Sequence, residues 1–266
     1  NIKATEYSPQ KDQIIPIMMN TSCSKSGNLI SVVSHHVYIT YDTIHKTLEI
    51  QTEVKNVHDH AKLVLIGSVP YIYGGIKKPG PFELLNNKFE ESKPKSRPST
   101  SLYLTLIQNI NAVQITPPKE GRIYHTCCSY DKYIVVYGGI NPRNRHRHFS
   151  DIYFYSVEAG EWFSTELPIN KTPEPRYKHS ASIYKNVMII HGGISSINDR
   201  VLNDTWLFIF LDGKWTSINL KNNRIVVPRF GHSSVIVNRF MFIIGGSTAS
   251  CSFPPPSSFS NAQKID

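Results

Sequence analysis

Short apolar stretches, separated by turn-forming residues, are the dominant pattern along this chain of 266 residues. The segments 134–137 and 187–190 are continuously apolar, and each is followed within one residue by a Gly-Gly pair. Continuous apolar runs of this length are typical of strands that are buried on both faces. The segment 180–184 alternates polar and apolar residues instead, and no long stretch shows the 3.6-residue periodicity of a helix. The pattern predicts an all-β protein.

The pattern also repeats at a fixed interval. The first two units contain Arg-x-x-His, an apolar run ending in Gly-Gly, an Asp followed by aromatic residues, and a Trp, and the third leaves the pattern after its Gly-Gly pair. Successive copies of each landmark are 53 or 54 residues apart. The landmarks are His125, His179 and His232; Gly138, Gly192 and Gly245; Asp151 and Asp204; and Trp162 and Trp215. Agreement at four separate landmarks predicts one repeated unit of four short strands, which is the spacing of a propeller blade.

This combination resembles the kelch repeat, closely over 117–246 and more weakly upstream, where Gly74 and Gly75 end an earlier apolar run. The resemblance implies a kelch-type β-propeller, with about five blades visible and the first and last incomplete. We expect blades over 37–246, an N-terminal extension or partial first blade over 1–36, and a low-complexity Ser/Pro-rich tail over 247–266. Kelch rings resembling this one have six or seven blades, so we expect a fragment; the alternative is that 1–36 fold back to complete the ring.

The repeated glycines, tryptophans and histidines are expected to serve the fold. A Gly pair at the end of a buried strand permits positive φ and close approach of the backbone, and Trp rings at one position of each unit are expected to pack between sheets. Histidines at the same place in successive units indicate structural hydrogen bonding, so no metal and no cofactor is predicted. The structural positions are Gly74, Gly75, Gly138, Gly139, Gly192, Gly193, Gly245, Gly246, Trp162 and Trp215.

Basic residues mark one face of the predicted ring. Arg122, Arg176 and Arg229 begin the innermost strand of successive units, and two roles stay open for them: struts to Asp151 and Asp204, or contacts with carboxylates or phosphates of a ligand. Because strands alternate in direction, the connections between second and third strands open on the same face. The predicted partner-binding residues are therefore these three arginines together with Lys77, Lys78, Arg143, Arg145, His146 and Arg147.

A net charge of +9 favours an acidic partner. The kelch proteins that this chain resembles act as scaffolds or substrate-recognition modules, which implies a non-catalytic protein–protein interaction module. Combined with the charge, this gives the expectation of a protein partner with an acidic segment. A nucleic-acid partner would rest on charge alone, because no recognition helix or stacking motif is present. A copper enzyme resembling galactose oxidase is the third alternative, but the tyrosines, histidines and cysteines here stand at repeat positions.

The four cysteines show no C-x-x-C spacing. Cys127 and Cys128 are adjacent in a predicted strand, where their side chains point to opposite faces, so we expect reduced thiols. No apolar run approaches the roughly 18 residues of a membrane span, and the sequence from Asn1 shows no signal-peptide pattern. We therefore expect a cytoplasmic protein with no membrane span; the Asn-x-Ser/Thr triplets at Asn20, Asn170 and Asn203 are expected to be fortuitous.

Overall fold

The computed structural model describes residues 22–34, 37–51, 58, 60–75, 104–108, 111–115, 121–141, 148–165, 172–218, 226–248 and 263–265. Every regular element among these residues is a β-strand, which confirms the expected all-β class. In this part of the chain there is no helix with the length and apolarity to cross a bilayer.

The described strands form five antiparallel sheets that follow one another in chain order. The first contains β1 (Ser22–Ser26), β2 (Leu29–Ser34), β3 (Val37–Asp42) and β4 (Thr47–Gln51). The second contains β5 (Lys62–Ile66), β6 (Val69–Tyr73), β7 (Leu104–Gln108) and β8 (Asn111–Ile115). The third contains β9 (Thr126–Tyr130), β10 (Tyr133–Tyr137), β11 (Ile152–Ser156) and β12 (Glu161–Ser164).

The fourth sheet has an innermost strand in two parts, both paired with the same neighbour. It contains β13 (Arg176–Tyr177), β14 (Ser180–Tyr184), β15 (Val187–Ser195), β16 (Val201–Ile209) and β17 (Lys214–Ile218). The fifth contains β18 (Ser233–Val237), β19 (Phe240–Ile244) and β20 (Gln263–Ile265).

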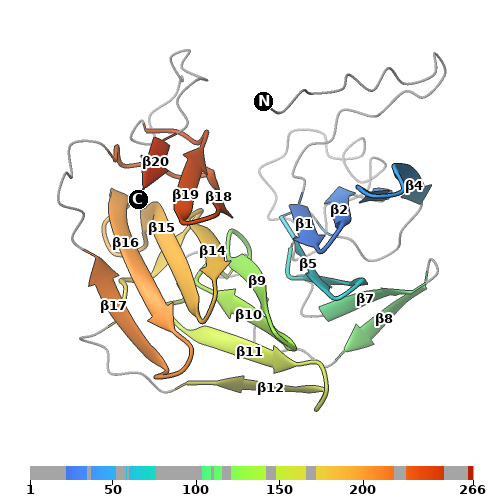
Figure 1. The fold of residues 1–266 in the computed structure, drawn as a ribbon. Coiled ribbons are helices and arrows are strands. Elements are labelled where there is room, and N and C mark those ends of the chain that lie inside the picture. Colours follow the sequence, from blue (N-terminus) through green and yellow to red (C-terminus); the bar gives the residue numbers. More distant parts are fainter. Residues whose placement is uncertain are drawn as a thin grey trace, which may run out of the picture.

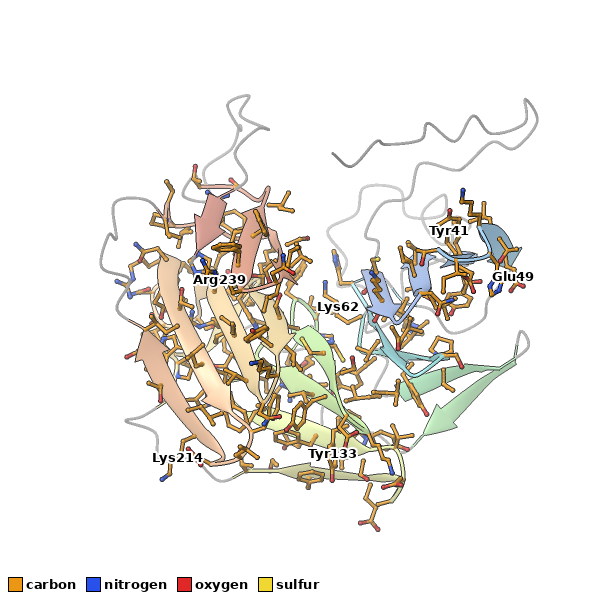
Figure 2. All side chains as sticks on the ribbon, in the orientation of Figure 1. Tyr41, Glu49, Lys62, Tyr133, Lys214 and Arg239 are labelled. Carbon is orange, nitrogen blue, oxygen red and sulfur yellow. The ribbon has the colours of Figure 1, made fainter. Side chains whose placement is uncertain are left out.

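The five sheets stand side by side around a common axis (Figure 1), which is the arrangement of a β-propeller. In Figure 1 the strands β1, β5, β9, β14 and β18 lie nearest the axis, and β4, β8, β12 and β17 lie at the outside. Figure 2 shows side chains between the sheets, with Lys62 near the axis and Glu49 and Lys214 at the outer edge. The predicted propeller is confirmed.

Two sheets differ in detail from the sequence-based expectation. The first is more complete than expected, because β1 and β2 lie in the segment 1–36 and give this sheet four strands. The polar sequence of β1, Ser-Cys-Ser-Lys-Ser, carries no apolar run that would mark a strand. The fifth sheet has three strands among the described residues, and its third strand, β20, comes from the segment that the composition indicated as a tail. At three residues this strand is too short for a sequence signal.

The core lies between the sheets, because the second strand of each inner sheet faces a neighbour on both sides. In β10 the alternate residues Val135 and Tyr137 pack toward the fourth sheet, where they join the cluster of Trp215. The intervening Ile134 and Val136 pack toward the second sheet. Stability therefore depends on the fit between successive sheets, and the repeated landmarks lie at these junctions.

The repeated tryptophans contact rings of the preceding sheet. The ring of Trp215 in the fourth sheet lies 4.9 Å from that of Tyr137 in the third. The ring of Trp162 in the third sheet lies 5.3 Å from that of Tyr73 in the second. Each Trp thus covers an aromatic residue that ends the second strand of the preceding sheet.

Candidate functional site

The two faces of the ring carry different kinds of connection. The turns between first and second strands are the two-residue segments 27–28, 67–68, 131–132, 185–186 and 238–239; we call their side the turn face. Second strands end and third strands begin on the opposite side, the loop face; the segments that connect them in sequence are 35–36, 74–103, 138–151, 196–200 and 245–262. Variation in length is thus concentrated on the loop face, and variable loops on a rigid scaffold are where binding residues are usually found.

Two arginines on the loop face are held in buried ion pairs. The guanidinium of Arg176 donates to both carboxylate oxygens of Asp204 at 2.7 Å and to the carbonyl of Gly192 at 3.1 Å. Its side chain is 0% exposed. Arg176 therefore ties β13 to β15, which contains Gly192, and to β16, which contains Asp204.

Arg122 follows the same plan, and Arg229 shares the bond to the glycine carbonyl. Arg122 donates to Asp151 at 2.9 and 3.3 Å and to the carbonyl of Gly138 at 3.1 Å. Arg229 donates to the equivalent carbonyl of Gly245 at 2.9 Å. The pairs of Arg122 and Arg176 correspond to the strut alternative of the sequence analysis. Their guanidinium groups are already bonded in this structure.

The carboxyl group of Asp204 is held in its ionised form. Burial would raise its pKa, but the hydrogen bonds from Arg176 and from the indole of Trp206 hold the pKa below its ordinary value. The strut is therefore a charged pair, in which each partner depends on the other.

The repeated histidines pack against glycines of the preceding sheet. A methyl group built on Gly138 would lie 2.7 Å from the carbonyl oxygen of Arg176 and 2.8 Å from Cε1 of His179. At these distances no side chain fits. The φ angle of Gly138 is +66°, in the left-handed region that favours glycine. The Gly-Gly of one unit and the Arg-x-x-His of the next thus form one contact, repeated at Gly74 with His125 and at Gly192 with His232.

Burial keeps these histidines neutral. It lowers the pKa of His125 and of His179 well below the ordinary value, with nearby Arg122 and Arg176 acting in the same direction. Burial also lowers the pKa of His191 to about 4 and that of His232 to about 3. The four imidazoles are structural groups at the junctions between sheets.

Acidification is therefore expected to unfold the protein in a window set by these histidines. In the unfolded chain they bind protons below about pH 6.5, whereas in the folded chain they stay neutral, so stability is retained above that pH and lost as the pH falls. Each histidine contributes about 1.4 kcal/mol per pH unit to this loss. The loss is measured as the change in the free energy of unfolding, obtained by urea denaturation at pH 7, 6 and 5.

One substitution makes the pH experiment specific. His191→Tyr installs the residue found at the equivalent positions 73 and 137, and is expected to reduce the slope by one proton. A slope equal to that of the unchanged chain would contradict the assignment.

Residues with unusual backbone conformation lie where the chain enters the innermost strands of the second, third, fourth and fifth sheets. His60, Tyr124, Lys178 and Gly231 hold equivalent positions and have φ angles of 62°, 57°, 55° and 66°. The amide of Lys178 donates to the carbonyl of Tyr124 at 2.9 Å, and that of Gly231 donates to Lys178 at 2.8 Å. Positive φ is uncommon for bulky residues, and such strain is concentrated at functional sites.

Three of these side chains, together with that of Phe230, form a half-buried cluster on the loop face. The rings of His60 and Tyr124 are 4.6 Å apart. The ammonium of Lys178 lies 4.8 Å from the ring centre of Tyr124 and 5.4 Å from that of Phe230. We call His60, Tyr124, Lys178 and Phe230 the rim cluster. Sequence reasoning missed it, although Gly231 at one equivalent position is a signal for positive φ.

The remaining predicted binding residues, Lys77, Lys78, Arg143, Arg145, His146 and Arg147, lie outside the described residues. The strands that flank them are described. β6 and β10 end at the loop face, and β7 and β11 begin there. Within the described ranges, no group of three or more His, Cys, Asp or Glu side chains could hold a metal ion.

Comparison with known proteins gives a consistent match. The KLHDC2/KLHL20/DRC7 Kelch-repeats domain matches residues 32–246. An F-box/kelch-repeat protein of Arabidopsis thaliana is 31% identical over 138 residues, which cover 48% of this chain and 28% of that protein. Kelch domain-containing protein 3 of Bos taurus is 24% identical over 210 residues, covering 77% of this chain and 51% of that protein. A tRNA wybutosine-synthesizing protein 2/3/4 of Oryza sativa is 27% identical over 116 residues, covering 44% and 11%. The chain thus spans about half or less of these relatives.

Proposed function

Because the chain belongs to the kelch-repeat family, we propose that it is a non-catalytic module that binds a protein partner through its loop face. Kelch-repeat domains are protein-interaction modules in general. The observation that carries the proposal is the rim cluster, in which bulky residues adopt positive φ at equivalent positions of neighbouring sheets. Such strained positions, with aromatic rings and one ammonium group beside the axis, are suited to contact a partner.

The partner is proposed to carry an acidic segment. Arg122 and Arg176 are neutralised by their aspartates, so the charge for binding has to come from other groups on this face. Lys178 in the rim cluster is one such group. Arg143, Arg145 and Arg147 belong to the connection between β10 and β11 and add three further cations. The excess positive charge would also speed association with an acidic protein.

The substrate-recognition role is the finer part of the proposal. The Arabidopsis relative is described as an F-box/kelch-repeat protein, so the repeat occurs there beside a second domain. The tRNA wybutosine-synthesizing relative shares only 11% of its length with this chain, which gives no basis for assigning its activity here. Cys23, Cys127 and Cys128 are free thiols. They support the proposal that the protein works in the cytoplasm, where thiols stay reduced.

Charge reversal on the loop face is expected to weaken partner binding, whereas the same reversal on the turn face is expected to have no effect. Replacing Arg143, Arg145 and Arg147 by Glu is expected to reduce capture of the partner at least tenfold, because the basic connection would then repel an acidic segment. Immobilised whole chain is exposed to cell extract, and bound proteins are identified and quantified by mass spectrometry.

The matched control reverses three cations of the turn face, with Lys132, Lys185 and Arg239 replaced by Glu. These residues lie in the exposed two-residue turns. Both triple variants change the net charge from +9 to +3, since each reversal subtracts two. Equal losses in the two variants would show a general charge effect and contradict the proposal. If the chain captured only nucleic acid, and nuclease treatment abolished the capture, the partner would be a nucleic acid and not a protein.

A further inference from the structure

The innermost strands of the five sheets begin with the same kind of residue, except in the second sheet. By register, their first residues hold equivalent positions at the loop-face end. Four of these residues carry a hydroxyl group and one is a lysine: Ser22, Thr126, Ser180, Ser233 and Lys62. The hydroxyl of Ser22 accepts a hydrogen bond from the amide of Leu63 at 2.8 Å. That of Thr126 lies 2.9 Å from Nε2 of His179. Lys62 is thus the one charged residue of this set.

The ammonium group of Lys62 lies beside the axis without a counter-charge. Its side chain is partly buried (Figure 2), and it forms no hydrogen bond or ion pair with any residue that the structure describes. Burial lowers the pKa of Lys62, and the groups that act against this shift are the thiols of Cys127 and Cys128 on β9. Lysine is rarely buried unless it is paired, because a charge that loses water needs a compensating partner.

The groups around Lys62 carry no negative charge at neutral pH. Burial raises the pKa of Cys127 well above its ordinary value and that of Cys128 to about 12, so both thiols keep their protons. Burial, with the ammonium of Lys62 as one of the smaller causes, lowers the pKa of His125 and of His179, so both imidazoles are neutral. The surroundings of Lys62 therefore favour the approach of an anion.

Lys62 lies directly below the rim cluster. It follows His60 by two residues, which corresponds to about 6 Å along an extended chain. Because β5 runs from the loop face toward the turn face, Lys62 is on the inner side of His60. The ammonium of Lys178, 4.8 Å from the ring centre of Tyr124, adds a second cation to the same side of the ring. A segment that contacts the rim cluster can therefore bring a side chain to Lys62.

We infer that Lys62 forms an ion pair with one carboxylate of the partner's acidic segment, an Asp or Glu side chain that passes the rim cluster. The inference rests on the proposed function and adds an anchoring contact to it. The carboxylate would supply the counter-charge and the hydrogen-bond acceptor that the ammonium lacks among the described residues. A charged pair with reduced access to water is stronger than one at the surface.

An oligoglutamate peptide is the probe, and an oligoglutamine peptide of equal length is its control. The whole chain is acetylated with acetic anhydride, with and without saturating peptide, and labelling of each lysine is followed by mass spectrometry. We expect oligoglutamate to slow acetylation of Lys62 at least tenfold and that of Lys25, which is exposed on β1, less than twofold. Unchanged acetylation of Lys62 overturns the inference, as does protection by inorganic phosphate but not by oligoglutamate, or equal protection by oligoglutamine.

Lys62→Thr separates binding from folding, because Thr is the residue at the equivalent position 126. Affinity for oligoglutamate is expected to fall at least tenfold. The midpoint of urea unfolding is expected to stay the same or rise, since an unpaired, partly buried cation is removed. Lys62→Met should behave in the same way, and Lys25→Thr should change the affinity less than twofold. Equal affinity in Lys62→Thr and the unchanged chain would contradict the inference, and a lower urea midpoint in both Lys62 variants would show a structural role instead.

The inference and the proposed function can fail separately. If Lys62→Thr binds the captured partner as tightly as the unchanged chain, while the variant with Glu at positions 143, 145 and 147 does not, Lys62 is no anchor and the loop face still binds. If neither change weakens binding of the captured partner, both proposals are contradicted.

Discussion

Replacing Gly138 by alanine is expected to lower the free energy of unfolding by about 3 kcal/mol or more. Two effects add. The residue has a φ of +66°, which strains any side chain by about 1 kcal/mol. The new methyl group would also lie 2.7 Å from the carbonyl of Arg176, and such overpacking destabilises by about 1–3 kcal/mol. Urea unfolding at pH 7, followed by tryptophan fluorescence, measures the change.

Gly213→Ala is the matched control, because it isolates the backbone strain. Gly213 has a φ of +61°, but a methyl group there would meet no atom within 4 Å. Gly213→Ala is therefore expected to lower the free energy of unfolding by only about 1 kcal/mol. Gly245→Ala should behave in the same way in this chain. If Gly138→Ala and Gly213→Ala lowered the free energy of unfolding equally, the close contact of Gly138 with the fourth sheet would not contribute to stability.

Removing the carboxylate of Asp204 is expected to be the other large effect. Asp204→Ala would leave the fully buried guanidinium of Arg176 without its counter-charge and would also take the acceptor of the Trp206 indole, 2.8 Å away. Breaking a buried pair on one side destabilises by about 3–5 kcal/mol. Because the Asp204 side chain is 37% exposed and water reaches it, we expect the lower end, about 3 kcal/mol.

The double variant Arg176→Met with Asp204→Ala tests whether the loss comes from the unpaired charge. Removing both partners is expected to restore much of the stability, because an apolar side chain replaces the buried cation. Glu158→Ala, which breaks the exposed pair with Lys132, should leave the unfolding midpoint unchanged. A double variant no more stable than Asp204→Ala would show that packing of the arginine, not charge, carries the effect.

The sequence predicted the fold wherever strands were apolar and landmarks recurred. β10 is an example, because its residues face neighbouring sheets on both sides and are therefore continuously apolar. β1 was not predicted, for a reason visible in the structure. Its Ser22 and Ser24 hydroxyls accept hydrogen bonds from the amides of Leu63 and Leu65 in the next sheet, at 2.8 and 3.0 Å. A strand that joins its neighbour through hydroxyl groups gives no apolar signal.

The candidate site was less accessible from sequence. The positions of the glycines and of Arg-x-x-His were found, but not that the glycine of one unit meets the histidine of the next, because these contacts join residues 40 to 51 positions apart. Tyr124 and Lys178 fall at a variable position inside the motif, and their positive φ follows from the backbone bonds between sheets. Local sequence preference gives no indication of it for these residue types.

Amide exchange of the full chain, alone and saturated with its captured partner, is the most direct test of binding through the loop face. The account predicts slower exchange in 121–125, 176–179 and 229–232, which adjoin the rim cluster, and no change in the turn-face segments 131–133, 185–187 and 238–240. Protection confined to the turn-face segments, with the three loop-face segments unchanged, would contradict it.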